Sequence, residues 1–388
     1  MKTENANSVK NYIIKSLTIT SSVLPFALSS AVFMGFDSFW CLYPGLFLTL
    51  YFVPKSKKIM PSYAAFLIAM FAAKACSPAT LSLAALICAV ISLIFYFLPK
   101  QFRIHDNPVT AGIMLSTALS VTVMLTTHYF GIGATGDTAK EMIASYLSLG
   151  FHPNWRGVLY GTVAMVIMLT FPRKFKNFCK VINAPFIAII VTLLLNLFLN
   201  PSYMPTAITE IGNIPSYDPS FENIFFWRSG EIDFKSAVLC GITLFLICNY
   251  TFTRNEMSKS DCRGVSAANI LSGTGWGLIQ LYNMPDKLNL GTLPLFLAIT
   301  VIFFLTGGMD RIPLHSLAVV MIVGAWESVE WRKIKEVFSS VPSVIFFVLS
   351  FASTLYFGYV YGILISAALY FIYHFVFQKR RTAGIINR

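Results

Sequence analysis

The feature that most constrains this chain is a succession of long apolar runs. The runs Ala79–Leu98 and Leu295–Thr306 are examples, and similar runs recur to the C-terminus. A helix needs about twenty apolar residues to cross a bilayer core about 30 Å thick. Only 12% of the residues are charged, whereas a soluble domain has roughly a quarter. The sequence therefore predicts an all-α polytopic membrane protein.

About fourteen spans can be placed along the chain, with a polar stretch between the first seven and the last seven. A short amphipathic helix at Asp137–Leu149 is expected to lie at the membrane interface. An odd number of spans in each half inverts one half relative to the other, which predicts 7+7 inverted repeats. The expected spans are 12–34, 39–53, 61–75, 79–98, 107–130, 155–172, 182–199, 235–253, 262–275, 278–290, 291–307, 312–326, 341–358 and 360–377.

These spans divide the chain into four parts. Residues 1–199 form the first repeat, 200–234 an extracytoplasmic connector, 235–377 the second repeat and 378–388 a basic cytoplasmic tail. The net charge of +12 could indicate nucleic acid as a partner. The basic residues fall instead in alternate short loops, which is typical of the cytoplasmic side of a membrane protein. The prediction is a multi-pass cell-membrane protein with both termini in the cytoplasm, membrane lipid around it and no nucleic acid.

Two interrupted segments stand in similar places in the two halves. In Lys55–Ser77, Pro61 comes before an apolar run of about fifteen residues, which is too short for a straight crossing. Gly275–Gly291 is likewise short and broken by glycine and proline. Paired breaks of this kind indicate the binding site of a transporter. Because a helix start presents unpaired N–H groups and the positive end of the helix dipole, such a site suits an anion.

Several longer motifs resemble the sulfate permease (SulP) family of anion transporters. Ile312–Glu336 is similar to the late-span signature of that family, and Ile211–Phe221 fits its G-x-I-P-S-x-x-P-S-F pattern. Partial matches follow in Leu24–Gly35, Val109–Ile113 and Asn269–Gly273. The resemblance implies a core domain and a gate domain, each drawn from both repeats, with the ligand between spans 3 and 10. The family usually carries a C-terminal STAS domain, which this chain is expected to lack, and a homodimer is allowed.

The resemblance also assigns candidate substrate-binding residues. On span 3, backbone N–H groups and hydroxyls near the break are expected to donate to the ligand, although a plain helix cap explains the same residues equally well. On span 10, the Asn283 amide and the Lys287 ammonium would supply the donor and the charge, and Asp286 could neutralise that charge. The candidates on these two spans are Pro61, Ser62, Tyr63, Ala64, Tyr282, Asn283, Met284 and Lys287.

Three further candidates depart from the family pattern. Phe26 replaces a common glutamine, Ser30 replaces an aromatic residue, and Asn249 stands where many members have a carboxylate. An asparagine inside an apolar stretch is costly to bury, so Asn249 should have a hydrogen-bond partner. Hydrogen bonding between helices and contact with the ligand are equally good explanations.

The predicted function is secondary active transport of a small anion by alternating access. Sulfate, bicarbonate, chloride or a dicarboxylate would fit, and no cofactor is expected, although Na⁺ or an exchanged anion could be the coupled species. A nucleobase permease of the same fold and a non-transporting receptor or scaffold are the alternatives. The sequence contains no nucleophile elbow, P-loop or HExxH motif, and its seven cysteines include no CxxC pair. It is therefore not expected to be an enzyme.

Overall fold

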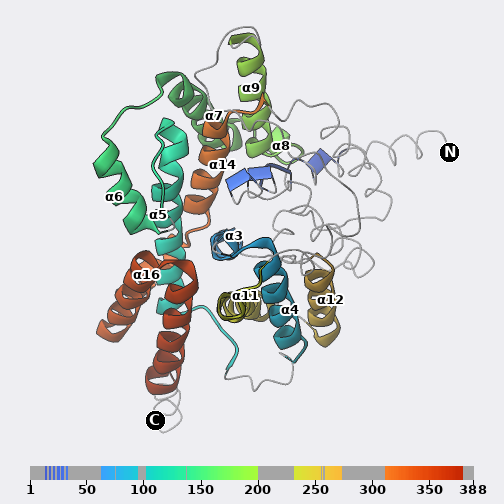
Figure 1. Cartoon of the computed structure of the whole chain (residues 1–388), viewed down its shortest axis with the longest axis vertical. Helices are drawn as coiled ribbons and strands as arrows, with labels where there is room; N and C mark the ends of the chain where they lie inside the picture. The colour runs from blue at the N-terminus through green and yellow to red at the C-terminus, as the bar shows by residue number, and fades with distance from the viewer. Residues whose placement is uncertain are drawn as a thin grey trace, which may run out of the picture.

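The computed structural model describes residues 63–74, 76–94, 102–136, 138–199, 231–254, 258–272 and 311–378, together with Glu256 and scattered residues between 14 and 33. Helices account for most of these residues (Figure 1). Their bounds are α3 Tyr63–Lys74, α4 Pro78–Ile94, α5 Pro108–Phe130, α6 Ala139–Leu149, α7 Trp155–Lys174, α8 Lys176–Cys179, α9 Ala184–Leu199, α11 Phe234–Arg254, α12 Lys259–Ser272, α14 Leu314–Glu327, α15 Trp331–Val337, α16 Val341–Tyr373 and the π-helical turn η7 His374–Gln378.

The helices in the described part of the chain fall close to the predicted spans. By length and composition, four segments are long and apolar enough to cross a membrane: α5, α7, α11 and Val341–Val376, the last of which is bent at Gly358. Three shorter apolar helices lie at Ala79–Ile94, Ala184–Leu199 and Leu314–Glu327. A helix also forms near the predicted amphipathic segment, as α6, whereas its place at the membrane interface stays a prediction. The short helix α15 was not predicted.

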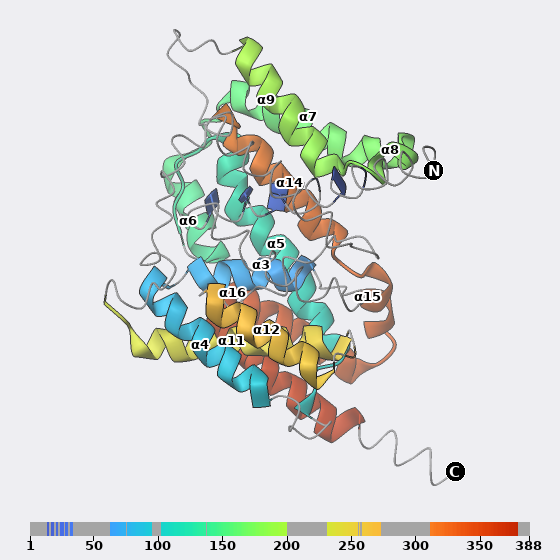
Figure 2. The same cartoon turned by 90° about the vertical axis from the view of Figure 1, so that its right-hand side faces the viewer.

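The described helices pack as two groups. In the first helix group, α4 packs along α11 and α12, and α3 contacts α11. In the second helix group, α5 packs along α16 and α14, and α7 packs along α14 and α9. The two groups touch mainly where α3 meets α5 and where α11 meets α16, and α3 lies near the middle of the molecule (Figure 2). Each group contains helices from before and after residues 200–230.

The second helix group is held together by a close approach between α5 and α16. Asn107 caps α5 in a reciprocal capping box with Thr110, and Pro108 fits the first turn because it has no N–H to satisfy. One turn later, Gly112 faces α16 so closely that an added Cβ would lie 2.6 Å from the carbonyl oxygen of Phe347. The Ser350 hydroxyl donates a hydrogen bond of 3.1 Å to the carbonyl oxygen of Val109 across the same contact.

Helix α16 is a hairpin of two helical arms, residues 341–357 and 359–373. Gly358 joins them with φ 75° and ψ −172°, a conformation essentially restricted to glycine. The arms run side by side, because Ser353 Oγ lies 3.1 Å from Ser366 Oγ and Ser343 Oγ lies 3.1 Å from the Tyr373 hydroxyl. The two predicted last spans, 341–358 and 360–377, correspond to these arms.

Candidate functional site

The first half of the predicted binding site begins at α3. This helix starts at Tyr63, directly after the predicted break, and its twelve residues extend only about 18 Å at 1.5 Å per residue. The segment 67–72 is buried throughout, and α3 contacts α11 in the first helix group and α5, α14 and α16 in the second. A short helix enclosed by other helices is the expected form of an interrupted span.

Most of the candidate ligand residues lie outside the residues whose side chains the structure describes. Tyr63 and Ala64 form the first turn of α3, and only their backbone is described. Their role as ligand donors stays a prediction. The candidates outside the described residues are Ser30, Pro61, Ser62, Tyr282, Asn283, Met284 and Lys287.

Two candidates can be placed in full. Phe26 is half-buried and packs against the main hydrophobic core. Asn249 is 2% exposed and bonds the loop that precedes α5: it accepts a hydrogen bond of 3.1 Å from the Ile104 N–H and donates one of 3.1 Å to the Phe102 carbonyl oxygen. The expectation that Asn249 has a partner is confirmed, and the partner is a backbone loop. Contact with a ligand stays a prediction.

A second helix, α16, also binds the same loop. The Tyr370 hydroxyl of α16 accepts a hydrogen bond of 2.9 Å from the His105 N–H and donates one of 3.0 Å to the Arg103 carbonyl oxygen. The Tyr250 hydroxyl of α11 donates a hydrogen bond of 2.6 Å to Asp106 Oδ1. The loop 102–107 is therefore tied to both helix groups.

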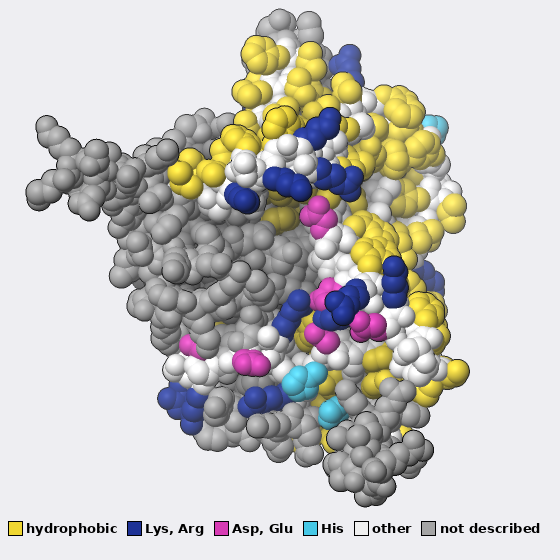
Figure 3. Space-filling model, turned by 180° about the vertical axis from the view of Figure 1, so that it is seen from behind, with side chains coloured by type: hydrophobic (Ala, Val, Ile, Leu, Met, Phe, Trp, Pro, Cys, Tyr) yellow, Lys and Arg dark blue, Asp and Glu magenta, His cyan; other side chains and the backbone are white. Residues whose placement is uncertain are grey.

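Charged side chains complete this contact. Lys333 Nζ of α15 lies 2.6 Å from Asp106 Oδ2 and 2.5 Å from Glu330 Oε2, and Arg254 Nη1 at the end of α11 lies 3.0 Å from Glu330 Oε1. Figure 3 shows side chains of both charges gathered on one face of the molecule. We call the loop 102–107 and the side chains that bind it, with the Arg254–Glu330 pair, the 102–107 junction.

The electrostatics of Asp106 follow from these contacts. Burial raises the pKa of its carboxyl group, but the hydrogen bonds from Lys333 and Tyr250 and the charges of Lys333 and Arg254 outweigh burial and hold the pKa below its usual value. Partial burial lowers the pKa of His105, and the positive charges of the neighbouring His374 and Arg103 lower it further by a smaller amount. The junction is thus built around an ionised carboxylate.

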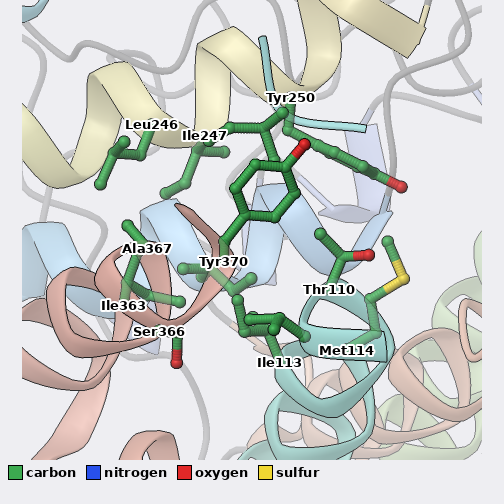
Figure 4. A pocket seen from close by; sticks show the side chains of 13 residues that line it. Thr110, Ile113, Met114, Leu246, Ile247, Tyr250, Ile363, Ser366, Ala367 and Tyr370 are labelled. Carbon is green, nitrogen blue, oxygen red and sulfur yellow. The ribbon is translucent and has the colours of Figure 1, made fainter. Parts of the chain in front are cut away.

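An apolar cavity lies directly beside the junction (Figure 4). Its hydroxyl groups are occupied elsewhere: Tyr250 bonds Asp106, Tyr370 bonds the loop, and Ser366 bonds Ser353. The cavity is therefore apolar, unlike the predicted anion site. Both helix groups and the loop line it, through Ile68, Ile104, Val109, Thr110, Ile113, Met114, Leu246, Ile247, Tyr250, Ile363, Ser366, Ala367 and Tyr370.

Of the residues of the junction, sequence reasoning singled out Asn249 alone. Asp106 falls in a predicted loop, and Tyr250 and Tyr370 fall in apolar runs where tyrosine is common packing. The spacing of Tyr250 and Arg254, four residues apart near the end of a predicted span, was the available signal of a polar helix end.

Comparison with known proteins identifies the fold. No protein-family model and no curated protein sequence matches the chain. Solved structures do match: SLC26A9, with a TM-score of 0.67 and 12% identity over 93% of this chain, and the transmembrane domain of the cyanobacterial bicarbonate transporter BicA, with a TM-score of 0.62 and 14% identity over 93% of this chain. The murine anion transporter Slc26a9 in its inward-facing state matches with a TM-score of 0.67 and 13% identity over 95% of this chain.

The chain is therefore an all-helical, multi-pass membrane protein with the fold of these transporters, and the resemblance inferred from the motifs is confirmed at the level of fold. It covers 97% of the BicA transmembrane domain, 68% of the murine Slc26a9 chain and 64% of the SLC26A9 chain. The two proteins whose activity is named are transporters, in agreement with the prediction that this chain is not an enzyme.

Proposed function

We propose that this chain is a secondary active transporter of a small anion, working by alternating access. The observation that carries the proposal is the match to the fold of an anion transporter and a bicarbonate transporter over more than nine-tenths of the chain. Sulfate, bicarbonate, chloride and dicarboxylates are the candidate substrates, with sodium or a second anion as the coupled species. A homodimer is part of the proposal.

The proposed architecture is fourteen spans in two inverted repeats, with a core domain and a gate domain. The two helix groups support this assignment, because each combines helices from before and after residues 200–230. We assign the first helix group to the core domain and the second to the gate domain. Relative movement of the two groups would then expose the site alternately on each side.

The proposed orientation has both termini in the cytoplasm. Loops that carry basic residues lie together at one end of the helices, since Arg254 pairs with Glu330 and Lys333 with Asp106. Segments predicted to lie on the extracytoplasmic side of the membrane also contact one another. The Asp233 N–H of the connector donates a hydrogen bond of 3.2 Å to Thr80 Oγ1 at the start of α4. Both contacts agree with the alternation of basic loops in the sequence.

The proposed anion site lies between the N-terminal ends of α3 and the predicted span 278–290. The short, enclosed α3 supports this placement, because the N–H groups of its first turn have no partner within the helix. Ser62 and Asn283 would add hydrogen-bond donors, and Lys287 would add positive charge. Asn249 is better explained as an anchor of the loop 102–107 than as a ligand residue.

The first experiment is thermal unfolding of the detergent-purified protein against a panel of anions and nucleobases, with and without sodium. A ligand that binds the folded state raises the apparent melting temperature by mass action. One anion should raise it, and Ser62→Ala or Asn283→Ala should abolish the rise. Ser260→Ala is the control, because this serine of α12 is exposed and belongs to neither interrupted segment of the sequence.

Uptake of that anion into proteoliposomes then tests transport itself. Saturable uptake is expected, with reduced uptake in the Ser62→Ala variant. If only a nucleobase stabilises the protein, the substrate class is wrong. If an anion binds but no anion is taken up, the receptor or scaffold alternative is favoured.

A further inference from the structure

At the 102–107 junction the two helix groups are joined by both hydrogen bonds and ion pairs. From the first helix group, Asn249 binds the backbone at Phe102 and Ile104. From the second, Tyr370 binds the backbone at Arg103 and His105. The bonds to the two groups thus alternate along four successive residues.

This alternation makes the junction sensitive to movement between the groups. The four hydrogen bonds are 2.9–3.1 Å long, and a hydrogen bond is essentially lost when its length grows by about 0.5–1 Å. The loop cannot follow α11 and α16 at once if these helices move apart. If α11 and α16 move apart by more than about 1 Å, the loop must lose its hydrogen bonds to one of the two helix groups.

The ion pairs reinforce the same contact. Arg254 belongs to the first helix group, whereas Glu330 lies at the start of α15, which packs against α5 and α16 in the second group. The two side chains are 34% and 29% exposed, so water can reach the pair when it opens. A pair of this kind contributes about 1 kcal/mol or less, which allows release as well as closure.

The apolar cavity lies on the path of such an opening. Leu246, Ile247 and Tyr250 of α11 face Ile363 and Ala367 of α16 across it. Tyr250 and Tyr370 line the cavity and also bind the loop. Release of the junction would therefore widen the cavity and expose its buried lining, such as Ile363, to water.

We propose that the 102–107 junction is a releasable lock between the two helix groups, closed in this structure, and that release of Arg254 from Glu330 is part of the opening step of the transport cycle. The proposal rests on the proposed function for its place in transport. The lock itself can be measured without any anion.

The test follows the reaction of one cysteine placed in the cavity. Ile363→Cys is introduced, because Ile363 lines the cavity from α16 and is only 5% exposed, and its labelling by a charged, water-soluble thiol reagent is timed in purified, anion-free protein. The parent protein without Ile363→Cys gives the background from the native cysteines. Arg254→Gln and Glu330→Gln should each speed labelling about fivefold, because removing about 1 kcal/mol from the closed state raises the open fraction by that factor.

Two controls separate the lock from general loosening. Arg332→Gln removes an ion pair within α15, to Glu336, whose side chains are 94% and 65% exposed, and it should leave the labelling rate unchanged. Arg254→Lys, which keeps the positive charge opposite Glu330, should leave the rate close to that of the parent. Equal rates in all variants, or faster labelling with Arg332→Gln as well, would overturn the proposal.

A second measurement remains informative if the glutamine variants fold poorly. Arg254→Cys and Glu330→Cys are bridged by a short thiol-specific cross-linker, and each single-cysteine protein is treated in parallel. Only the bridged protein should lose anion uptake while the anion still stabilises it against heat. Full uptake by the bridged protein would refute the lock. Absence of uptake by untreated protein would instead refute the proposed function and leave the labelling result intact.

Discussion

Replacing Asn249 by leucine tests whether this residue anchors the loop or binds the substrate. Leucine has nearly the same volume but can neither accept from the Ile104 N–H nor donate to the Phe102 carbonyl. Ile104 is 7% exposed, so its N–H would lose its acceptor away from water, at about 1–3 kcal/mol. Phe102 is 38% exposed, so water can replace the second bond, at about 1 kcal/mol. The expected loss is about 2–4 kcal/mol of unfolding free energy.

Equilibrium unfolding in mixed micelles measures this loss directly. Thr243→Val is the matched control in the same helix, because the Thr243 hydroxyl donates mainly to the Leu239 carbonyl of its own helix, at 2.9 Å, and its removal should cost less than about 1 kcal/mol. Anion affinity of the folded Asn249→Leu protein should be unchanged. Unchanged unfolding free energy together with a tenfold loss of anion affinity would refute the anchoring role.

Three further predictions concern the hairpin, its packing and the junction. Gly358→Ala should lower the unfolding free energy by about 1–3 kcal/mol, because alanine rarely adopts φ 75°. Gly133→Ala is the control in the same denaturation assay and should have little effect, because its Cβ would meet no atom within 4 Å. Gly112→Ala should cost a similar amount, about 1–3 kcal/mol, because its Cβ would overlap the Phe347 carbonyl, and a variant as stable as the parent would contradict that contact. The pKa of Asp106 is lower in the folded protein than in the unfolded chain, where it is about 3.9. The ionised carboxylate therefore stabilises the fold at pH values above about 3.9, and this stabilisation is lost as the pH falls through the pKa of the folded protein. Asp106→Asn should therefore reduce stability equally at about pH 8 and pH 6 but less below about pH 3, as unfolding at several pH values would show.

The helices were largely predictable because each is a local pattern. The predicted span 107–130 agrees with α5 within one residue. Asparagine is a favoured N-cap and proline a favoured first residue of a helix, so Asn107 and Pro108 together indicate a helix start. The predicted division near residue 358 was also right, because a glycine within a long apolar run permits a turn that other residues resist. The helix α15 was missed, since its basic residues also suit a cytoplasmic loop.

The contacts around the candidate site were much less predictable. Asn249 was recognised as a buried polar residue that needs a partner, but its partner lies 145 residues away in the loop at Ile104. No local periodicity encodes which loop a helix will meet. Asp106 and Tyr370 look ordinary in the sequence, and their importance comes from the distances that folding creates. The anion-binding role of residues in the predicted span 278–290 remains a prediction from the resemblance.

The one-residue turn at Gly358 has a consequence for how the chain enters the membrane during synthesis. A turn this short offers no loop to translocate on its own, so the two arms of α16 should be inserted together as a preformed pair. The serine hydroxyl contacts between the arms favour such pairing, because lipid chains compete poorly for hydrogen bonds. The turn carries no charge, so the orientation of the pair should be decided by the basic residues that flank it in the sequence. Lys335 precedes the first arm, and Lys379–Arg381 follow the second arm.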